Sequence, residues 1–179
     1  MGLPAREMNL LQIHITGMSN GGMLIWSRIL ERMSNILAST ATVCSAPLRG
    51  FNPMPEVPIN MIDFHGTLDN VVPISPDAPD NRGPGPDDTT MTKDGYYYHI
   101  KLHHLTQVLT SMHCDLTSSV YNTHMDGVEG WSCVQWSGCD QEKTVVHCTG
   151  EYGHGYPFVP DNKVEGLRIL WDFMKTKSK

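Results

Sequence analysis

One serine in the chain has the neighbours that a nucleophile needs. It lies in Gly17-Met18-Ser19-Asn20-Gly21, between a strand-like stretch and a helical pattern. A serine at the tip of such a strand–turn–helix points its hydroxyl out above the sheet, and the flanking glycines remove side chains that would clash across the turn. The backbone N–H of Asn20 is then placed to donate to an oxyanion. The alternative interpretation is that Ser19 is the N-cap of a glycine-rich helix.

An acid and a base of the matching types occur further along the chain. Asp69 ends His65-Gly66-Thr67-Leu68-Asp69, directly after a predicted strand, and His154 has a glycine on each side. A carboxylate that accepts a hydrogen bond from an imidazole fixes its tautomer, and the imidazole can take a proton from a serine. Singly, Asp69 also fits an Asx-turn and His154 an exposed loop histidine. Together, Ser19, Asp69 and His154 follow the chain order of the α/β-hydrolase triad.

The elements that must position these residues follow from the apolar pattern. Strands are predicted at 10–16, 40–46, 59–64 and 143–149, with a short strand at 118–123 and a loop or edge strand at 131–136. Helices are predicted at 21–33, 96–112 and 163–175, and loops at 47–58 and 73–95. Strands separated by helices pair in parallel through right-handed crossovers. We therefore expect one α/β domain over residues 1–179, with a mostly parallel sheet and helices on both faces.

The two later helices each have predicted core positions at helical spacing. In the helix at 96–112 these positions are Tyr97, Ile100, Leu102, Leu105, Val108 and Leu109. In the closing helix at 163–175 they are Val164, Leu167, Leu170, Trp171 and Met174.

Composition narrows the class of partner. The 179 residues carry a net charge of −6 at pH 7, and 40% of them are hydrophobic. Phosphate binding needs a basic face, so nucleic acid and anionic membranes are not expected partners. No apolar run reaches the roughly 18 residues of a membrane span. These features indicate a globular protein.

Five cysteines, four of them within a short C-terminal stretch, favour an oxidising compartment. None of their spacings is that of a zinc ribbon, so two disulfides and one leftover cysteine are expected, with the pairing open from the sequence alone. The alternative is five unpaired thiols. The cysteines are Cys44, Cys114, Cys133, Cys139 and Cys148.

The sequence resembles the secreted polyhydroxybutyrate depolymerase-like and feruloyl esterase-like enzymes, which have the α/β-hydrolase fold. The matching stretches are TGMSNGGM (16–23), FHGTLDNVVP (64–73), WSCVQWSGC (131–139) and GHGYP (153–157). The resemblance implies Ser19 as nucleophile, Asp69 as acid and His154 as base, without a metal or organic cofactor. It also implies extracellular localisation and the disulfides Cys114–Cys139 and Cys133–Cys148. The expected substrates are feruloyl or acetyl esters of plant polysaccharide, or polyhydroxybutyrate-type polyesters.

Family members carry several strands before the nucleophile, whereas only residues 1–18 precede Ser19 here. The chain is therefore expected to be the C-terminal part of the domain, without the N-terminal strands, the signal peptide and the loop that supplies a second oxyanion N–H. Two rival interpretations follow. One is an inactive fragment or pseudoenzyme, and the other is a secreted module that binds carbohydrate or polymer through tyrosine and tryptophan.

Two further groups of side chains have types that could bind a ligand. His99 and His103 are four residues apart on a predicted helix, with His104 beside them, a spacing that can bind a metal. No acidic third ligand accompanies them, so we expect surface histidines. The aromatic residues Tyr96, Tyr97, Tyr98, Trp131 and Trp136 fit either an aromatic-binding pocket or core packing.

Overall fold

The computed structural model describes residues 12–78, 80–117, 119–121, 131–157 and 165–179. The described strands are β1 (His14–Met18), β2 (Ser39–Val43), β3 (Asn60–Gly66), β4 (Thr89–Met91), β5 (Tyr97–His99), β6 (Ser119–Tyr121), β7 (Trp131–Trp136) and β8 (Val145–Gly150). The α-helices are α1 (Asn20–Leu24), α2 (Leu30–Met33), α3 (Lys101–Ser111) and α4 (Glu165–Met174). A π-helical turn, Ile25–Ile29, joins α1 to α2, and a 3-10 turn, Asp140–Glu142, precedes β8.

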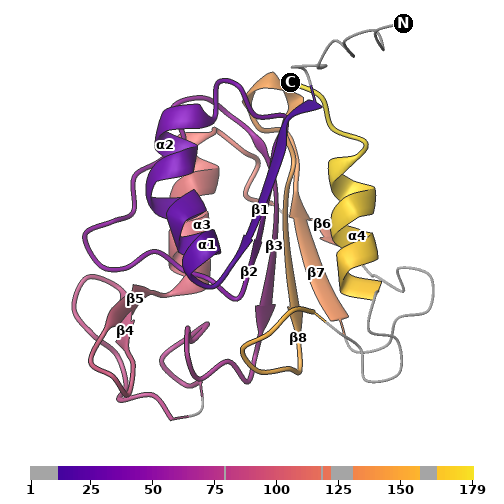
Figure 1. The fold of residues 1–179 in the computed structure, drawn as a ribbon. Coiled ribbons are helices and arrows are strands. Elements are labelled where there is room, and N and C mark those ends of the chain that lie inside the picture. The colour runs from indigo at the N-terminus through magenta and orange to yellow at the C-terminus, as the bar shows by residue number, and fades with distance from the viewer. Residues whose placement is uncertain (1–11, 79, 118, 122–130, 158–164) are drawn as a thin grey trace, which may run out of the picture.

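Six strands form one sheet in the order β1-β2-β3-β8-β7-β6. The first four are parallel to one another, while β7 is antiparallel to β8 and β6 to β7. Helices α1, α2 and α3 lie on one side of the sheet and α4 on the other (Figure 1). The predicted α/β class with a mostly parallel sheet is confirmed. The antiparallel edge arises because β7 reaches β8 through a short connection, whereas a parallel pair needs a crossover of a dozen or more residues.

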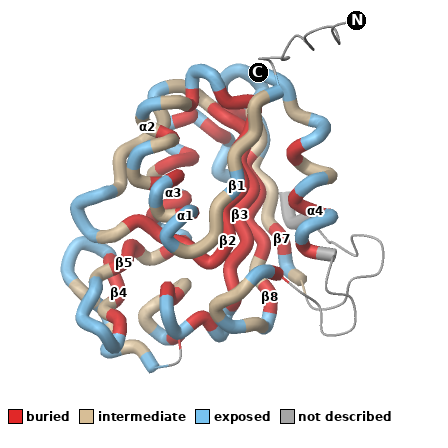
Figure 2. Tube along the Cα trace, in the orientation of Figure 1, coloured by how far each residue is buried: buried red, intermediate tan, exposed pale blue. Residues whose placement is uncertain are grey.

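The middle of the sheet is the centre of the core. Every residue of β2 and β3 is buried, and Figure 2 shows this as a continuous red band. Apolar side chains cover both faces of these strands, as expected for parallel strands between two helical layers. On the side of α1 to α3 they include Trp26, Leu30, Met61, Leu105, Val108 and Leu109. Under α4 they include Ile62, Phe64, Val146, Ile169, Leu170 and Met174.

The first strand lies slightly later in the chain than predicted. It spans His14–Met18 instead of 10–16, since Gly17 and Met18 pair with the last two residues of β2. Residues 10 and 11 lie outside the described part. The predicted helix at 21–33 is present as α1, the π-helical turn and α2.

The helix predicted at 96–112 begins later, because its first residues form a strand. Tyr97–His99 is β5, which pairs antiparallel with β4, and Ile100 has the extended ψ of 125°. The prediction that 73–95 is all loop was wrong at β4 for the same reason. In α3, Leu102 is 58% exposed instead of buried, whereas Leu105, Val108 and Leu109 are buried as predicted. Lys101 and His104 are buried on the same helix, so the buried face of α3 includes polar side chains that the apolar pattern did not indicate.

Two of the three histidines that we expected at the surface are buried. His99 is 5% exposed and His104 is fully buried, with the His104 ring 5.0 Å from the Trp26 ring. Burial lowers the pKa of His104 to about 3, so this side chain is neutral. The side chain of His103 is exposed and lies 3.2 Å from Asp88.

The closing helix α4 presents a different face from the predicted one. Leu170 and Met174 are buried as expected, but Leu167 and Trp171 are exposed, and Ile169 is buried in their place. The predicted position Val164 lies outside the described residues. Among the described residues, no helix combines the length and apolar character needed to cross a membrane.

Both expected disulfides are present. Cys114, just after α3, is bonded to Cys139, and Cys133 on β7 is bonded to Cys148 on β8. The second bond joins directly paired positions of the two strands. Two disulfides are consistent with an extracellular protein. The fifth cysteine, Cys44, is free and buried.

Candidate active site at the carboxyl ends of the parallel strands

Ser19 lies in a tight turn between β1 and α1. Its φ of 53° and ψ of −122° fall in a region that non-glycine residues rarely adopt. Backbone hydrogen bonds hold this conformation: the Ser19 N–H donates to the carbonyl of Val43 at 3.0 Å, and the Ser19 carbonyl accepts from Met23 N–H at 2.8 Å. Strain of this kind persists where the surroundings fix it and is common at functional sites. Asn20 begins α1, in the first turn, where backbone N–H groups have no acceptor within the helix.

Close packing around this turn explains two of its glycines. A Cβ on Gly17 would lie 2.5 Å from the backbone carbon of Gly21, so the predicted need for glycine there is confirmed. The same prediction for Gly21 was wrong, because a Cβ on that residue would meet nothing within 4 Å. The second required glycine is Gly22, where a Cβ would lie 2.2 Å from Ser45 Oγ. Only the packing of α1 against the residues after β2 reveals this requirement.

The three predicted residues meet at this edge of the sheet. His154 Nε2 lies 2.9 Å from Ser19 Oγ, and His154 Nδ1 lies 2.9 Å and 3.1 Å from the two oxygens of Asp69. An ionised carboxylate can only accept, so Nδ1–H donates to Asp69. In a neutral imidazole Nε2 is then an acceptor, and the Ser19 hydroxyl donates to it. The histidine is therefore in the tautomer that can remove the serine proton.

Asp69 is fully buried and accepts several hydrogen bonds. Its Oδ1 accepts from the N–H groups of Val71 and Val72, both at 2.9 Å, so the Asx-turn and the contact with His154 occur together. Burial alone raises the pKa of Asp69, but hydrogen bonds from His65, His154 and Val72 outweigh it and hold that pKa at about 2. The carboxylate is thus ionised at any pH at which the protein is expected to act.

Cys44, to which the sequence assigned no role, lies next to the loop that carries His154. Cys44 follows β2, and its sulfur lies 3.2 Å from the carbonyl oxygen of Gly155 and 3.7 Å from that of Gly153. Donor atoms of Cys44, Asp69 and His154 all lie within 4.8 Å of one another, a set that could hold a metal ion. Any ion there would compete with the hydrogen bond between His154 and Asp69. Cys44 lies inside the strand predicted at 40–46, so no local pattern indicated this contact; the structure ends β2 at Val43.

A buried charged network lies between the sheet and α3. Asp63 Oδ1 accepts from Thr42 Oγ1 at 2.6 Å and from Lys101 Nζ at 3.0 Å, while Asp63 Oδ2 accepts from His147 Nδ1 at 2.8 Å. Lys101 Nζ also donates to the backbone carbonyl of Ser45. Burial raises the pKa of Asp63, but Lys101 and His147 reverse this and hold it far below the usual range. The network joins α3, β2, β3 and β8 close to the turn after β2.

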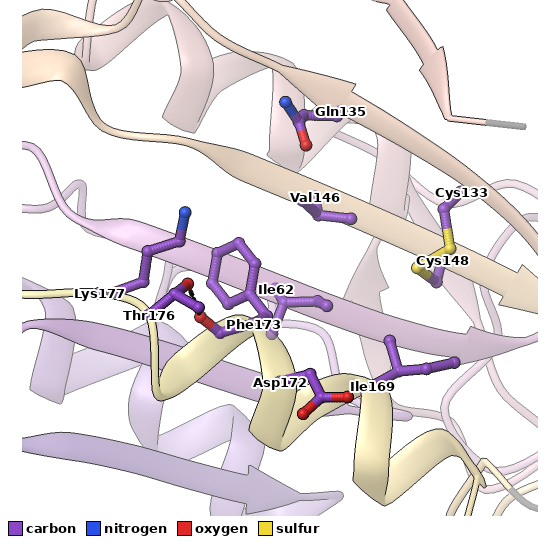
Figure 3. A pocket seen from close by; sticks show the side chains of 10 residues that line it. All are labelled: Ile62, Cys133, Gln135, Val146, Cys148, Ile169, Asp172, Phe173, Thr176 and Lys177. Atoms are coloured by element: carbon purple, nitrogen blue, oxygen red, sulfur yellow. Dashed lines mark hydrogen bonds between the residues drawn. A yellow bond between two sulfur atoms is a disulfide. The ribbon is translucent and has the colours of Figure 1, made fainter. Parts of the chain in front are cut away.

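Hollows in the described surface are lined by residues other than the nucleophile. One, of about 260 Å³, lies between α4 and the sheet; its apolar lining includes Ile62, Val146, Ile169 and Phe173, and its polar lining is Gln135, Asp172, Thr176 and Lys177 (Figure 3). Neither Ser19, Asp69 nor His154 lines it, so this cavity offers no reacting group. Another is open, with a volume of about 430 Å³, and lies beside the loop that carries Asp69. Its lining residues are Thr67, Leu68, Trp131, Ser132, Thr149, Gly150 and Glu151.

The aromatic residues divide between the surface and the core. Tyr98 is buried and Tyr96 is 58% exposed. Trp131 packs edge-on against Phe64, with ring centres 5.5 Å apart, and Trp136 packs against the core on the α3 side. Core packing therefore accounts for Tyr98 and Trp136. Trp131 also lines the open hollow beside the Asp69 loop, and Tyr96 and Tyr97 line another open hollow.

Comparison with protein-family models and with curated proteins gives no match. The function must therefore be argued from the geometry of Ser19, Asp69 and His154 and from the motifs around them.

Proposed function

We propose that this protein is a serine carboxylic-ester hydrolase of the α/β-hydrolase type. The observation that supports this most directly is the chain of hydrogen bonds from Ser19 Oγ through His154 to Asp69, with both contacts of the imidazole at 2.9 Å. A nucleophile, a base and an orienting carboxylate in this relation are the minimum set for acyl transfer. The strained serine turn between a parallel strand and a helix is the second supporting observation.

The first half of the proposed reaction forms an acyl-enzyme. His154 Nε2 takes the Ser19 proton as Ser19 Oγ attacks the ester carbonyl carbon, and Asp69 stabilises the imidazolium that results. The negative charge moves to the carbonyl oxygen, where the backbone N–H of Asn20 is one donor. When the carbonyl re-forms, the bond to the alkoxy group breaks, and His154 returns its proton to the departing alcohol.

The second half regenerates the enzyme. A water molecule enters, His154 removes one of its protons, and the remaining hydroxide adds to the acyl carbon. Collapse of this second tetrahedral intermediate breaks the bond to Ser19 Oγ, which recovers a proton from His154 as the carboxylic acid leaves. Every step uses groups of this chain and one water, so the proposal includes no metal and no organic cofactor.

The proposed substrate class rests on the resemblance of the four motif stretches to depolymerase-like and feruloyl esterase-like enzymes. It comprises feruloyl or acetyl esters of plant polysaccharide and polyhydroxybutyrate-type polyesters, cleaved outside the cell. Ser19 is half-buried, and the loop that carries Asp69 exposes the apolar side chains of Leu68 and Val71, which would contact a polymeric ester.

The test is hydrolysis of p-nitrophenyl acetate together with labelling by a fluorophosphonate, which reacts with an activated serine. Ser19→Ala is expected to abolish both while leaving the circular dichroism spectrum unchanged. His154→Gln is expected to lower the rate by about 10³-fold or more, in keeping with loss of a triad member. His113→Gln is the matched control, because His113 makes a comparable 2.7 Å contact with Asp140 at an exposed site without a serine.

The outcomes separate the proposal from its rivals. Hydrolysis that survives Ser19→Ala would exclude Ser19 as the nucleophile. A folded protein that neither hydrolyses the ester nor takes up the label would indicate a pseudoenzyme. Retention on xylan or polyester that is unchanged in Ser19→Ala, without hydrolysis, would indicate a binding module instead.

A further inference from the structure

Cys44 has its backbone fixed between the nucleophile and the strand that leads to the acid. It follows β2 with a φ of 43°, is fully buried, and its N–H donates to the carbonyl of Phe64 on β3 at 2.8 Å. The carbonyl of the peptide bond that precedes it, that of Val43, accepts the Ser19 N–H at 3.0 Å. The peptide unit between Val43 and Cys44 therefore fixes both the position of the serine turn and the direction of the Cys44 side chain.

The Cys44 side chain points from this fixed position to the loop that carries His154. Its sulfur approaches the carbonyl oxygens on both sides of the histidine, that of Gly155 at 3.2 Å and that of Gly153 at 3.7 Å. A thiol has one proton, so it donates to one carbonyl at a time, and the shorter contact is with Gly155. Glycines have wide conformational freedom. A contact at both of them limits how far the imidazole can move.

The backbone of the acid loop bonds the same segment at residues before the histidine, and Asp69 bonds the histidine ring itself. The N–H of Thr67 donates to the Gly150 carbonyl at 2.9 Å, and the N–H of Leu68 donates to the Tyr152 carbonyl at 3.0 Å. These bonds tie the base loop to Asp69. Besides the His154–Ser19 hydrogen bond, the contact from Cys44 ties the base loop to the serine side, since it continues through one peptide bond to the Val43 carbonyl and the Ser19 N–H.

We propose that Cys44 is a positioning residue, whose thiol holds the His154 loop at hydrogen-bonding distance from Ser19; this inference rests on the proposed hydrolase function. Burial raises the pKa of Cys44 to about 11, which keeps the sulfur protonated, and therefore a donor, at neutral pH. The neutral thiol also adds no second negative charge beside Asp69. The predicted defect of a variant without this donor is misalignment of the base, not loss of a reacting group.

The experiment compares Cys44→Ser, which keeps a donor, with Cys44→Ala, which removes it. Both keep a Cβ, so the backbone strain at positive φ is the same in the two variants. Misplacement of reacting groups by about 1 Å can lower a rate by roughly 100-fold. We expect Cys44→Ala to lower kcat for p-nitrophenyl acetate by about 10- to 100-fold with KM changed less than about twofold. Cys44→Ser should stay within about threefold of the original kcat.

Two controls separate positioning from a general loss of packing. Val145→Ala removes a buried side chain at the opposite end of β8, and it should lower the melting temperature without lowering kcat per labelled site. Fluorophosphonate titration counts the competent sites in each variant, so rates are compared per site. A kcat that falls as much in Val145→Ala as in Cys44→Ala would overturn the proposal.

A spectroscopic readout tests Cys44 without relying on catalysis. The His154 Nδ1 proton that is bonded to Asp69 should give a far-downfield proton NMR signal, assigned by its absence in His154→Gln. We expect this signal to persist in Cys44→Ser and to broaden or vanish in Cys44→Ala. An unchanged signal in Cys44→Ala overturns the role of Cys44 even if the wild-type protein hydrolyses no ester. Failure of the proposed function would show separately, as absence of wild-type hydrolysis and labelling.

Discussion

Replacing Lys101 by methionine would remove a positive charge from the buried network below the site. Lys101 is fully buried, and its ammonium donates to Asp63 Oδ1 at 3.0 Å and to the carbonyl of Ser45. It also lies 4.9 Å from the centre of the Trp26 ring. Methionine has a similar length and no charge, so the variant Lys101→Met keeps most of the packing and leaves Asp63 with Thr42 and His147 as partners.

The size of the effect follows from the burial of both charges. Removing one partner of a buried ion pair destabilises a protein by about 3–5 kcal/mol, because the other charge stays buried without compensation. An unfolding free energy of about 5–15 kcal/mol is usual for a domain, so the loss should be large. The double variant Lys101→Met with Asp63→Asn should recover at least about 2 kcal/mol of the lost unfolding free energy, since an asparagine amide leaves no unpaired charge buried.

The pH dependence has a definite sign. In the wild-type protein the folded-state pKa of Asp63 lies below its unfolded value, so this group stabilises the fold above about pH 4 and less as the pH falls. Without Lys101, burial should raise the folded-state pKa of Asp63 above the unfolded value. Protonation then favours the folded state, so the deficit of Lys101→Met relative to wild type should shrink between pH 8 and pH 5.

Urea unfolding with the disulfides oxidised, followed by tryptophan fluorescence at both pH values, would measure these differences. Lys175→Met is the matched control, because Lys175 pairs with Asp172 on the exposed side of the C-terminal helix. Its effect should be at most about 1 kcal/mol. A loss below about 1 kcal/mol in Lys101→Met, or strictly additive effects in the double variant, would refute the assignment of a stabilising buried pair.

Three further predictions concern the turn, the disulfide and the acid. Gly22→Ala places a Cβ 2.2 Å from a serine oxygen, so its unfolding free energy, measured with urea, should fall by about 1–3 kcal/mol and its rate of hydrolysis should fall too. Gly21→Ala should change neither quantity. Replacing Cys133 and Cys148 together by serine should lower the unfolding free energy by about 2–5 kcal/mol in the same assay. Because the pKa of Asp69 is held at about 2, its stabilising effect of about 2 kcal/mol should disappear between about pH 4 and pH 2. The unfolding free energy of Asp69→Asn should fall less over this pH range.

The sequence predicted those features of the fold and of the site that depend on short stretches of chain. The strand before Ser19, the helix after it and the loops with Asp69 and His154 each have a local pattern, and the structure brings these three residues together. The hairpin of β4 and β5 has no such pattern. It depends on contacts with distant residues, including His99 N–H to the Pro47 carbonyl at 3.0 Å.

The sequence did not predict the buried polar side chains. Apolar periodicity assigns lysine and histidine to the surface, and Lys101 and His104 both lie on the buried face of α3. The partner that makes burial of Lys101 tolerable, Asp63, is in the middle of a strand 38 residues earlier. Only the three-dimensional pairing of α3 with the sheet reveals that an acid faces this lysine.

The register of the sheet explains why three distant segments converge. Met18 pairs with Val43, Val43 with Phe64, and Phe64 with Cys148, so four parallel strands are aligned at this level. Ser19 follows the first of these positions directly, and the loops with Asp69 and His154 leave from the strands of the last two. A slip of β1 by one residue would move Ser19 by about 3.3 Å along the strand. That displacement exceeds the 2.9 Å between Ser19 Oγ and His154 Nε2, so the hydrogen bond requires this register.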